Sequence, residues 1–322
     1  MPARGPLCFK TPRLALAAVM VAATAWMAPA PDAGAITIRE DIDLRRINRA
    51  ANTSRYHGVG RIDNDAPRKS QSLAGTGTLI APQWVLTAGH VVDGTNAKTW
   101  STRFGSREIA GWAAPAGYGS GFGTDLALVK LTEPVTDIAP ATLRSESARF
   151  SEFNQRAIII GTGKSGFGDT GVQRTKQHNR LAINRVDGIV GDNILITDFD
   201  SPFTNTSQSG DAQATRLEGG LVAGDSGGPM FIREGSAWTL AAVAVYASTA
   251  DPAGLSGKYG EINGFVRLKN YLPWINSVIS GSVNPTLRST SGGGIVRPGG
   301  LPEPATAAVV LAGLGLLAQR RR

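Results

Sequence analysis

The chain has 322 residues, 42% of them hydrophobic and 18% charged, which suffices for one to three domains with a sizeable buried core. Its 40 glycines, 18 prolines and low charged fraction exclude a coiled coil, argue against bulk disorder and favour a turn-rich, β-dominated protein. The single cysteine cannot form an internal disulfide, and the formal net charge of +8 indicates a nucleic-acid partner only where basic residues gather on one face.

Residues 1–35 are typical of a secretory signal peptide. Basic residues precede an apolar stretch at 14–27 and small residues follow it: Arg4, Lys10 and Arg13 before, Ala33, Gly34 and Ala35 after. A positive start, an apolar middle and a small-residue cleavage site is the layout of such signals, and the stretch is short for a membrane span. We expect cleavage after Ala35, which removes Cys8 and leaves residues 36–55 as an N-terminal extension or propeptide.

The body of the chain, residues 56–279, carries short apolar and β-branched runs bounded by Gly, Pro, Asn or Asp. The runs lie at 77–80, 84–87, 126–131, 156–160, 193–197, 229–232, 239–246 and 265–268. Short strands at this spacing favour an all-β barrel or sandwich. One helix is expected over 269–280, where Leu272, Ile275 and Ile279 fall on one face.

Three motifs in this body carry chemistry. They are Thr87-Ala88-Gly89-His90 after a predicted strand, Thr124-Asp125-Leu126-Ala127-Leu128-Val129 in mid-chain, and Gly224-Asp225-Ser226-Gly227-Gly228-Pro229 near its end. In this order they resemble the chymotrypsin-like (trypsin-family) serine proteases, and the resemblance runs from about residue 59 to 279. It implies two antiparallel six-stranded β-barrels with a C-terminal helix.

The same resemblance assigns a catalytic triad. Ser226 is the expected nucleophile, His90 the general acid and base, and Asp125 the carboxylate that orients the imidazole. A serine hydroxyl needs an adjacent base near neutral pH, and histidine supplies one because its pKa lies near 6.5. The backbone N–H groups of Gly224 and Ser226 are expected to form the oxyanion hole. The implied activity is hydrolysis of protein or peptide substrates through an acyl-enzyme, without a cofactor.

The predicted specificity pocket departs from that of trypsins. The position six residues before Ser226, where trypsins have aspartate, holds Gly220, and Leu221 follows it. By the same resemblance Tyr246 and Ala247 line the pocket and Asn263 replaces a glycine of its wall. We therefore expect small or apolar side chains before the scissile bond, although a shift of the loop by two residues could bring Glu218 into the pocket.

Two further departures concern stability and activation. Val91 and Val222 stand where many relatives have cysteine, so the domain is expected to depend on its core and to keep its activity in reducing agent. No Ile-Val-Gly-Gly start is present, so Asp225, which would pair with the new N-terminal ammonium, has no assigned partner. One hypothesis is that cleavage after Ala35 frees the amine of Ile36 for this role.

Other kinds of site find little support. Gly161-Thr162-Gly163-Lys164-Ser165 resembles the end of a phosphate-binding loop, but the leading glycine of that pattern is replaced by Ile158. Three scattered histidines give no metal constellation, although a weak calcium site in an acidic loop stays open. Half of the formal charge lies in the two terminal segments, so we expect no nucleic-acid partner.

The last 43 residues are predicted to form a flexible linker followed by a C-terminal sorting signal. Residues 280–300 are rich in Ser, Gly and Pro, as in a flexible linker. Within residues 301–322, Pro302-Glu303-Pro304 is followed by an apolar run at 305–318 and by three arginines, which resembles the PEP-CTERM sorting signal of Gram-negative bacteria. That signal implies transient membrane insertion and removal by an exosortase-type enzyme. The alternative is an ordinary tail anchor, for which the run is short.

These patterns together predict a monomeric, exported serine endopeptidase at the cell envelope or surface, or outside the cell. Two alternatives stay open. One is a surface or biofilm-matrix binding protein that keeps the fold without catalysis. The other is a periplasmic quality-control protease of the HtrA type, against which stands the short stretch of chain after Ile279.

Overall fold

The computed structural model describes residues 36–64, 73–148, 150–174, 179–209, 214–248 and 257–291. The predicted signal peptide and sorting signal lie outside these ranges. Within them, no helix is both long enough and apolar enough to cross a membrane.

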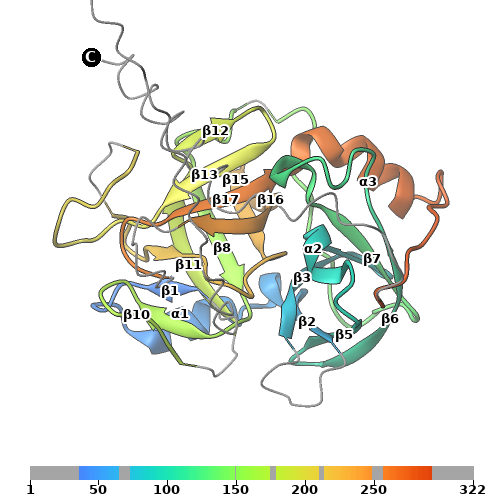
Figure 1. Ribbon diagram of the computed structural model, residues 1–322, viewed down its shortest axis with the longest axis horizontal. Helices are drawn as coiled ribbons and strands as arrows, with labels where there is room; N and C mark the ends of the chain where they lie inside the picture. Colours follow the sequence, from blue (N-terminus) through green and yellow to red (C-terminus); the bar gives the residue numbers. More distant parts are fainter. Residues whose placement is uncertain are drawn as a thin grey trace, which may run out of the picture. The chain divides into compact units, whose positions relative to one another are not determined.

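The first β unit is a closed barrel of six antiparallel strands (Figure 1). The strands are β2 (Val59–Asn64), β3 (Leu73–Ala81), β4 (Trp84–Thr87), β5 (Ala97–Thr102), β6 (Gly105–Ala113) and β7 (Ala127–Leu131). They pair in the order β2-β3-β4-β7-β6-β5, and β5 returns to β2. The interior is apolar and includes Trp100, whose indole N–H donates to the carbonyl of Gly77 at 3.2 Å. The large buried ring thus keeps its one polar group satisfied.

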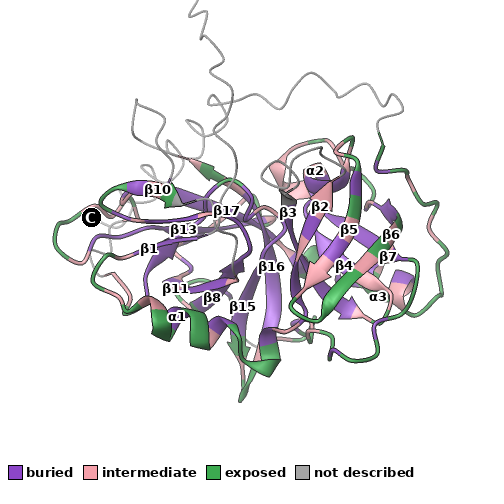
Figure 2. Cartoon of the chain, turned by 90° about the horizontal axis from the view of Figure 1, so that it is seen from below, coloured by how far each residue is buried: buried purple, intermediate pink, exposed green. Residues whose placement is uncertain are grey.

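The second β unit is a seven-stranded antiparallel sheet. Its strands are β8 (Arg156–Gly161), β11 (Arg180–Arg185), β12 (Gly188–Val190), β13 (Ile194–Asp198), β15 (Pro229–Glu234), β16 (Ala237–Ser248) and β17 (Ile262–Arg267). They pair in the order β11-β8-β15-β16-β17-β13-β12. The predicted all-β class is confirmed. This seven-stranded sheet occupies the place of the second predicted six-stranded barrel. Its strands are largely buried (Figure 2), and the ring of Phe231 packs 5.3 Å from that of Tyr56.

A small four-stranded sheet joins the N-terminal segment to this unit. It consists of β1 (Thr37–Ile38), β9 (Ser165–Phe167), β10 (Gly171–Arg174) and β14 (Gly219–Gly220). Thr37 lies opposite Gly220 in the register of β1 and β14, and Ile36 and Ile38 are fully buried. Helix α1 (Leu44–Ala51) follows, capped by Asp43, whose side chain accepts from the backbone N–H of Arg45 at 2.9 Å. The segment predicted as an extension or propeptide is therefore built into the domain over residues 36–51.

The C-terminal helix is present but shorter than predicted. A 3-10 turn, η4 (Leu268–Tyr271), precedes α3 (Leu272–Ile279), which has a proline in its first turn. Proline suits this position because the N–H it lacks would have no partner inside the helix. The helix buries Leu272, Ile275 and Val278, so the apolar face is the predicted one except at its last position.

Residues 283–291, here called the strap, return to the first barrel. The backbone of Arg288 pairs with that of Trp112 through N–H···O bonds of 2.7 and 3.1 Å. The guanidinium of Arg288 lies 5.0 Å from the ring of Trp112 and 5.5 Å from that of Tyr118. The N–H of Asn96 donates to the carbonyl of Thr290 at 2.9 Å. The first part of the segment predicted as a flexible linker thus has fixed contacts, and residues 292–300 lie outside the described ranges.

Candidate active site

Strand pairing brings His90 and Asp125 together. His90 lies in the short helix α2 (Gly89–Val92) directly after β4, and Asp125 follows the 3-10 turn η3 (Phe122–Thr124) just before β7. Strands β4 and β7 are antiparallel neighbours, with Thr87 opposite Ala127. The end of one strand therefore meets the start of the other, and the two side chains project from adjacent points of the barrel.

The two predicted triad side chains are in direct contact. Nδ1 of His90 lies 2.5 Å from Oδ2 of Asp125, and the backbone N–H of His90 donates to Oδ1 at 2.9 Å. The Asp125 side chain is 7% exposed, whereas that of His90 is 38% exposed. A buried carboxylate that holds Nδ1 fixes the ring orientation and assigns proton transfer to Nε2.

The loop that carries Ser226 is fastened to the same barrel. The backbone N–H of Thr76 in β3 donates to the carbonyl of Ser226 at 2.8 Å. Gly227 has a φ of 83°, and a Cβ there would lie 2.0 Å from the carbonyl oxygen of Thr76 and 2.1 Å from Oγ1 of Thr87. Only glycine combines this backbone conformation with so close an approach. The partly exposed Ser226 is thereby held beside the strands that lead to His90.

Glycine also sets the conformation of the predicted oxyanion loop. Gly224 has a φ of 95°, in the region that side chains disfavour. Its carbonyl accepts a hydrogen bond from the Thr76 hydroxyl at 3.1 Å. Thr76 therefore fixes the backbone on both sides of Asp225, within the segment whose N–H groups at Gly224 and Ser226 are the predicted oxyanion donors.

Asp225 is fully buried beneath this loop. Its Oδ2 accepts from the backbone N–H of Val222 at 3.0 Å, and a Cβ on Gly161 would lie 1.9 Å from its Oδ1. Burial raises the pKa of the Asp225 carboxyl well above its usual range, against the N–H groups of Val222 and Gly163 and the charge of Arg180, which lower it. Arg180 is itself buried and lies opposite Gly161 in the register of β11 and β8. It is thus a cation placed near Asp225 that the sequence did not indicate.

The five predicted pocket residues lie on three neighbouring elements. Gly220 ends β14 and Leu221 follows it, while β16 and β17 place Ala247 opposite Asn263. The fully buried Asn263 accepts the N–H of Leu221 on its Oδ1 at 2.7 Å. The ring of Tyr246 covers Gly264, where a Cβ would lie 2.1 Å from it. Asn263, which is predicted to replace a glycine of the pocket wall, is thus an amide side chain bonded to Leu221, at the predicted base of the pocket.

Glu218 is buried next to this region and is bonded to the backbone. Its Oε2 accepts from the N–H of Thr215 at 2.5 Å. Burial raises the pKa of Glu218 to about 8, opposed by the Thr215 N–H and assisted by Asp200 and Asp198. At neutral pH this carboxyl is mostly protonated, so it supplies little negative charge for a basic substrate side chain.

The variant Glu218→Gln is expected to change how stability depends on pH. The native state holds this proton more tightly than the unfolded chain, so the group lowers the free energy of unfolding as the pH rises from 4.5 to about 8. The slope is about 1.4 kcal/mol per pH unit at most. Glutamine cannot ionise, so urea unfolding should find the variant equally stable near the low end of this window and more stable at its high end. The exposed Glu133→Gln is the control, and parallel curves for both variants would contradict the assignment.

Other polar groups near the site were not indicated by any sequence motif. Thr76 is one of them. The same strand also contains Thr78, and nothing in the sequence distinguishes the two threonines. Tyr118 is another: its hydroxyl donates to Asp93 at 3.1 Å, and its ring leaves no room for a Cβ on Gly89, next to His90. Among the described residues, no group of three or more His, Cys, Asp or Glu could hold a metal ion.

The fold, a closed six-stranded barrel followed by a second antiparallel β unit and a C-terminal helix, is that of the chymotrypsin-like class. The family model described as Trypsin matches residues 50–275. The chain therefore belongs to the trypsin family.

Curated relatives are similar over the same region. Snake venom serine protease KN5 of Trimeresurus stejnegeri is 27% identical over 239 residues, which cover 67% of this chain and 81% of that protein. Snake venom serine protease KN6 of the same species is 26% identical, over 67% of this chain and 81% of its own length. Vitamin K-dependent protein C of Mus musculus is 26% identical over 65% of this chain and 47% of that protein.

Proposed function

We propose that the protein is an exported serine endopeptidase that hydrolyses peptide bonds through an acyl-enzyme. The observation that carries the proposal is the 2.5 Å contact between Nδ1 of His90 and Oδ2 of Asp125, on the barrel to which the Ser226 loop is fastened. A histidine held in this way is oriented to act as base through its other ring nitrogen. Membership of the trypsin family supports the same assignment.

In the proposed mechanism, Oγ of Ser226 attacks the scissile carbonyl while Nε2 of His90 removes its proton. Asp125 stabilises the imidazolium that forms, and the N–H groups of Gly224 and Ser226 stabilise the oxyanion. His90 then gives the proton to the leaving amine, which departs. Water, activated by His90, attacks the acyl-enzyme, releases the acid product and restores Ser226.

Covalent labelling tests this function against a non-catalytic binding protein on the same fold. The purified mature protein is treated with an organophosphate, and the modified peptide is identified by mass spectrometry. A triad serine should react at Ser226, and Ser226→Ala should abolish both labelling and peptide hydrolysis. Ser147→Ala, at an exposed serine, is the matched control. A folded protein that takes up no label would refute the catalytic assignment.

Substrate preference follows from the pocket residues. We expect cleavage after small or apolar side chains, because Asn263 narrows the wall and Gly220 places no carboxylate at the base. A panel of chromogenic peptides with Arg, Phe, Leu or Ala before the leaving group should be cleaved fastest at Ala or Leu. In Asn263→Gly the preference should shift toward Phe. Fastest cleavage after Arg by the unmodified enzyme would overturn this expectation.

Export and surface sorting complete the proposal. They are supported by the signal-like pattern in residues 1–35 and by the Pro-Glu-Pro motif, apolar run and arginines in residues 301–322. On this proposal an exosortase-type enzyme removes the tail at the inner membrane. The mature enzyme then acts at the cell envelope or surface of a Gram-negative bacterium, or outside the cell.

A further inference from the structure

A polar cavity lies apart from the proposed catalytic residues. Its volume is about 200 Å³, and it lies between the connection that joins the two β units and the segment leading into α3. Three basic side chains and one acidic side chain line it: Arg144, Arg267, Lys269 and Glu152. Phe150 and Leu272 add apolar surface. None of these residues belongs to the triad or to the predicted specificity pocket.

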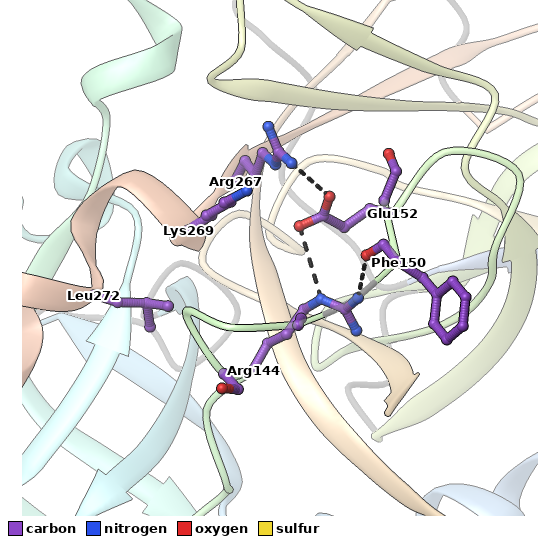
Figure 3. Close-up of a pocket in the computed structure, with 9 residues that line it drawn as sticks. Arg144, Phe150, Glu152, Arg267, Lys269 and Leu272 are labelled. Carbon is purple, nitrogen blue, oxygen red and sulfur yellow. Dashed lines mark hydrogen bonds and ion pairs between the residues drawn. The ribbon is translucent and has the colours of Figure 1, made fainter. Parts of the chain in front are cut away.

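One carboxylate in this cavity is shared by two guanidinium groups. Nη2 of Arg267 lies 2.7 Å from Oε2 of Glu152, and Nε of Arg144 lies 3.8 Å from Oε1 (Figure 3). The side chains are 11%, 6% and 3% exposed for Arg267, Arg144 and Glu152. Burial alone would raise the pKa of Glu152, but its bonds with Arg267 and the charge of Arg144 lower it below its usual value. The three groups therefore carry an excess of one positive charge, and the exposed Lys269 adds a second.

The two arginines that line the cavity also have donor atoms without a partner in the described part of the chain. Nη2 of Arg144 donates to the carbonyl of Phe150 at 2.8 Å, and Nη1 of Arg267 donates to that of Asp192 at 3.3 Å. Nη1 of Arg144 and Nε of Arg267 are buried and have no hydrogen-bond acceptor among the described residues. A charged donor that is buried without an acceptor destabilises the fold, so the two arginines that line this cavity have hydrogen-bonding capacity that the described residues leave unused.

We propose that this cavity binds a small oxyanion, a carboxylate, sulfate or phosphate group, between Arg144, Arg267 and Lys269. An oxyanion supplies both the negative charge and the acceptor atoms that the cavity lacks, and guanidinium groups are well suited to bind such groups. The cavity has room for one such group with neighbouring atoms or water. The inference concerns a second site and does not depend on the proposed peptidase activity.

Calorimetric titration of the purified protein tests the site. Sodium sulfate, sodium phosphate and sodium acetate are titrated separately at constant ionic strength, so that general screening is the same in every arm. We expect saturable binding with one site per chain for at least one of the three. Sulfate or phosphate binding without acetate binding identifies a tetrahedral oxyanion, and the reverse identifies a carboxylate.

Charge reversal at the rim of the cavity provides the matched variants. Lys269→Glu should weaken binding by about tenfold or more, because it replaces attraction by repulsion at a short distance. Lys98→Glu makes the same charge change at an exposed position of β5 and should leave the affinity unchanged. Arg144→Met, checked for folding by circular dichroism, should abolish binding. No saturable binding of any probe, or equal weakening by Lys98→Glu and Lys269→Glu, would overturn the proposal.

Discussion

Replacing Asp125 by asparagine is expected to lower kcat for peptide hydrolysis by about 10⁴-fold while the protein stays folded, a magnitude established for triads of this kind. In the native protein the backbone N–H of His90 donates to Oδ1 of Asp125 at 2.9 Å. The amide oxygen of the asparagine can still accept this hydrogen bond. Its NH₂ group would then face Nδ1, so the ring would carry its proton on the wrong nitrogen to act as base.

Steady-state kinetics with a chromogenic peptide measures this loss, and thermal unfolding verifies the fold. Asp137→Asn is the control, because this exposed carboxylate forms only a surface ion pair with Arg107 at 3.4 Å. A loss of less than about tenfold in kcat would show that Asp125 does not orient the base.

Replacing Asp225 by asparagine is expected to lower kcat/KM by about 10²- to 10³-fold, equivalent to the loss of one oxyanion donor. The carboxylate is fully buried and holds the N–H of Val222 at 3.0 Å, so it braces the loop from Val222 to Ser226. An amide offers one acceptor oxygen in place of two and cannot interact with the charge of Arg180 as the carboxyl group does, so the loop is expected to reorganise. Kinetics with a small ester and a peptide measures the effect, with the exposed Asp169→Asn as control.

The partner of Asp225 can be identified in the same series. Arg180 is the cation whose charge acts on it in the structure, and Ile36 is the residue whose amine would be freed by cleavage after Ala35. Burial of Ile36 and the pairing of Thr37 with Gly220 support the second role, since they bring the N-terminal segment to the predicted base of the pocket. If Arg180 is the partner, Arg180→Met should reproduce the loss. If the amine of Ile36 is the partner, activity should require an N-terminus at that residue, as Edman sequencing of active enzyme would show.

Sequence predicts best the parts of this fold that are locally patterned. The run at 84–87 is a strand with those bounds, and the runs at 156–160 and 229–232 are extended by one or two residues as β8 and β15. Strand β5 has only isolated apolar residues, and β6 begins with four mostly exposed small or polar residues, so neither strand was predicted from an apolar pattern.

Features that depend on distant partners were not predictable. Strand β1 has only two residues, too few to show a periodic pattern. It forms because it pairs with β14, and that partner could not be predicted because it lies about 180 positions further along the chain. The cavity residues Arg144 and Glu152 meet Arg267 only in the folded protein, and in the sequence each resembles an ordinary surface charge. By contrast, the His and Asp motifs could be recognised because short segments with fixed spacing carry them.

The strap determines how the domain would carry mechanical load. Tension applied beyond residue 291 would first reach the hydrogen bonds of Arg288 with Trp112 and of Thr290 with Asn96, and not helix α3. While these bonds hold, a protein tethered by its C-terminus transmits force into the barrel that contains His90. Helix α3 and the strand β17 that bears Asn263 would then lie outside the direct path of that force. The strap would therefore shield the second β unit from tension applied to the C-terminal segment.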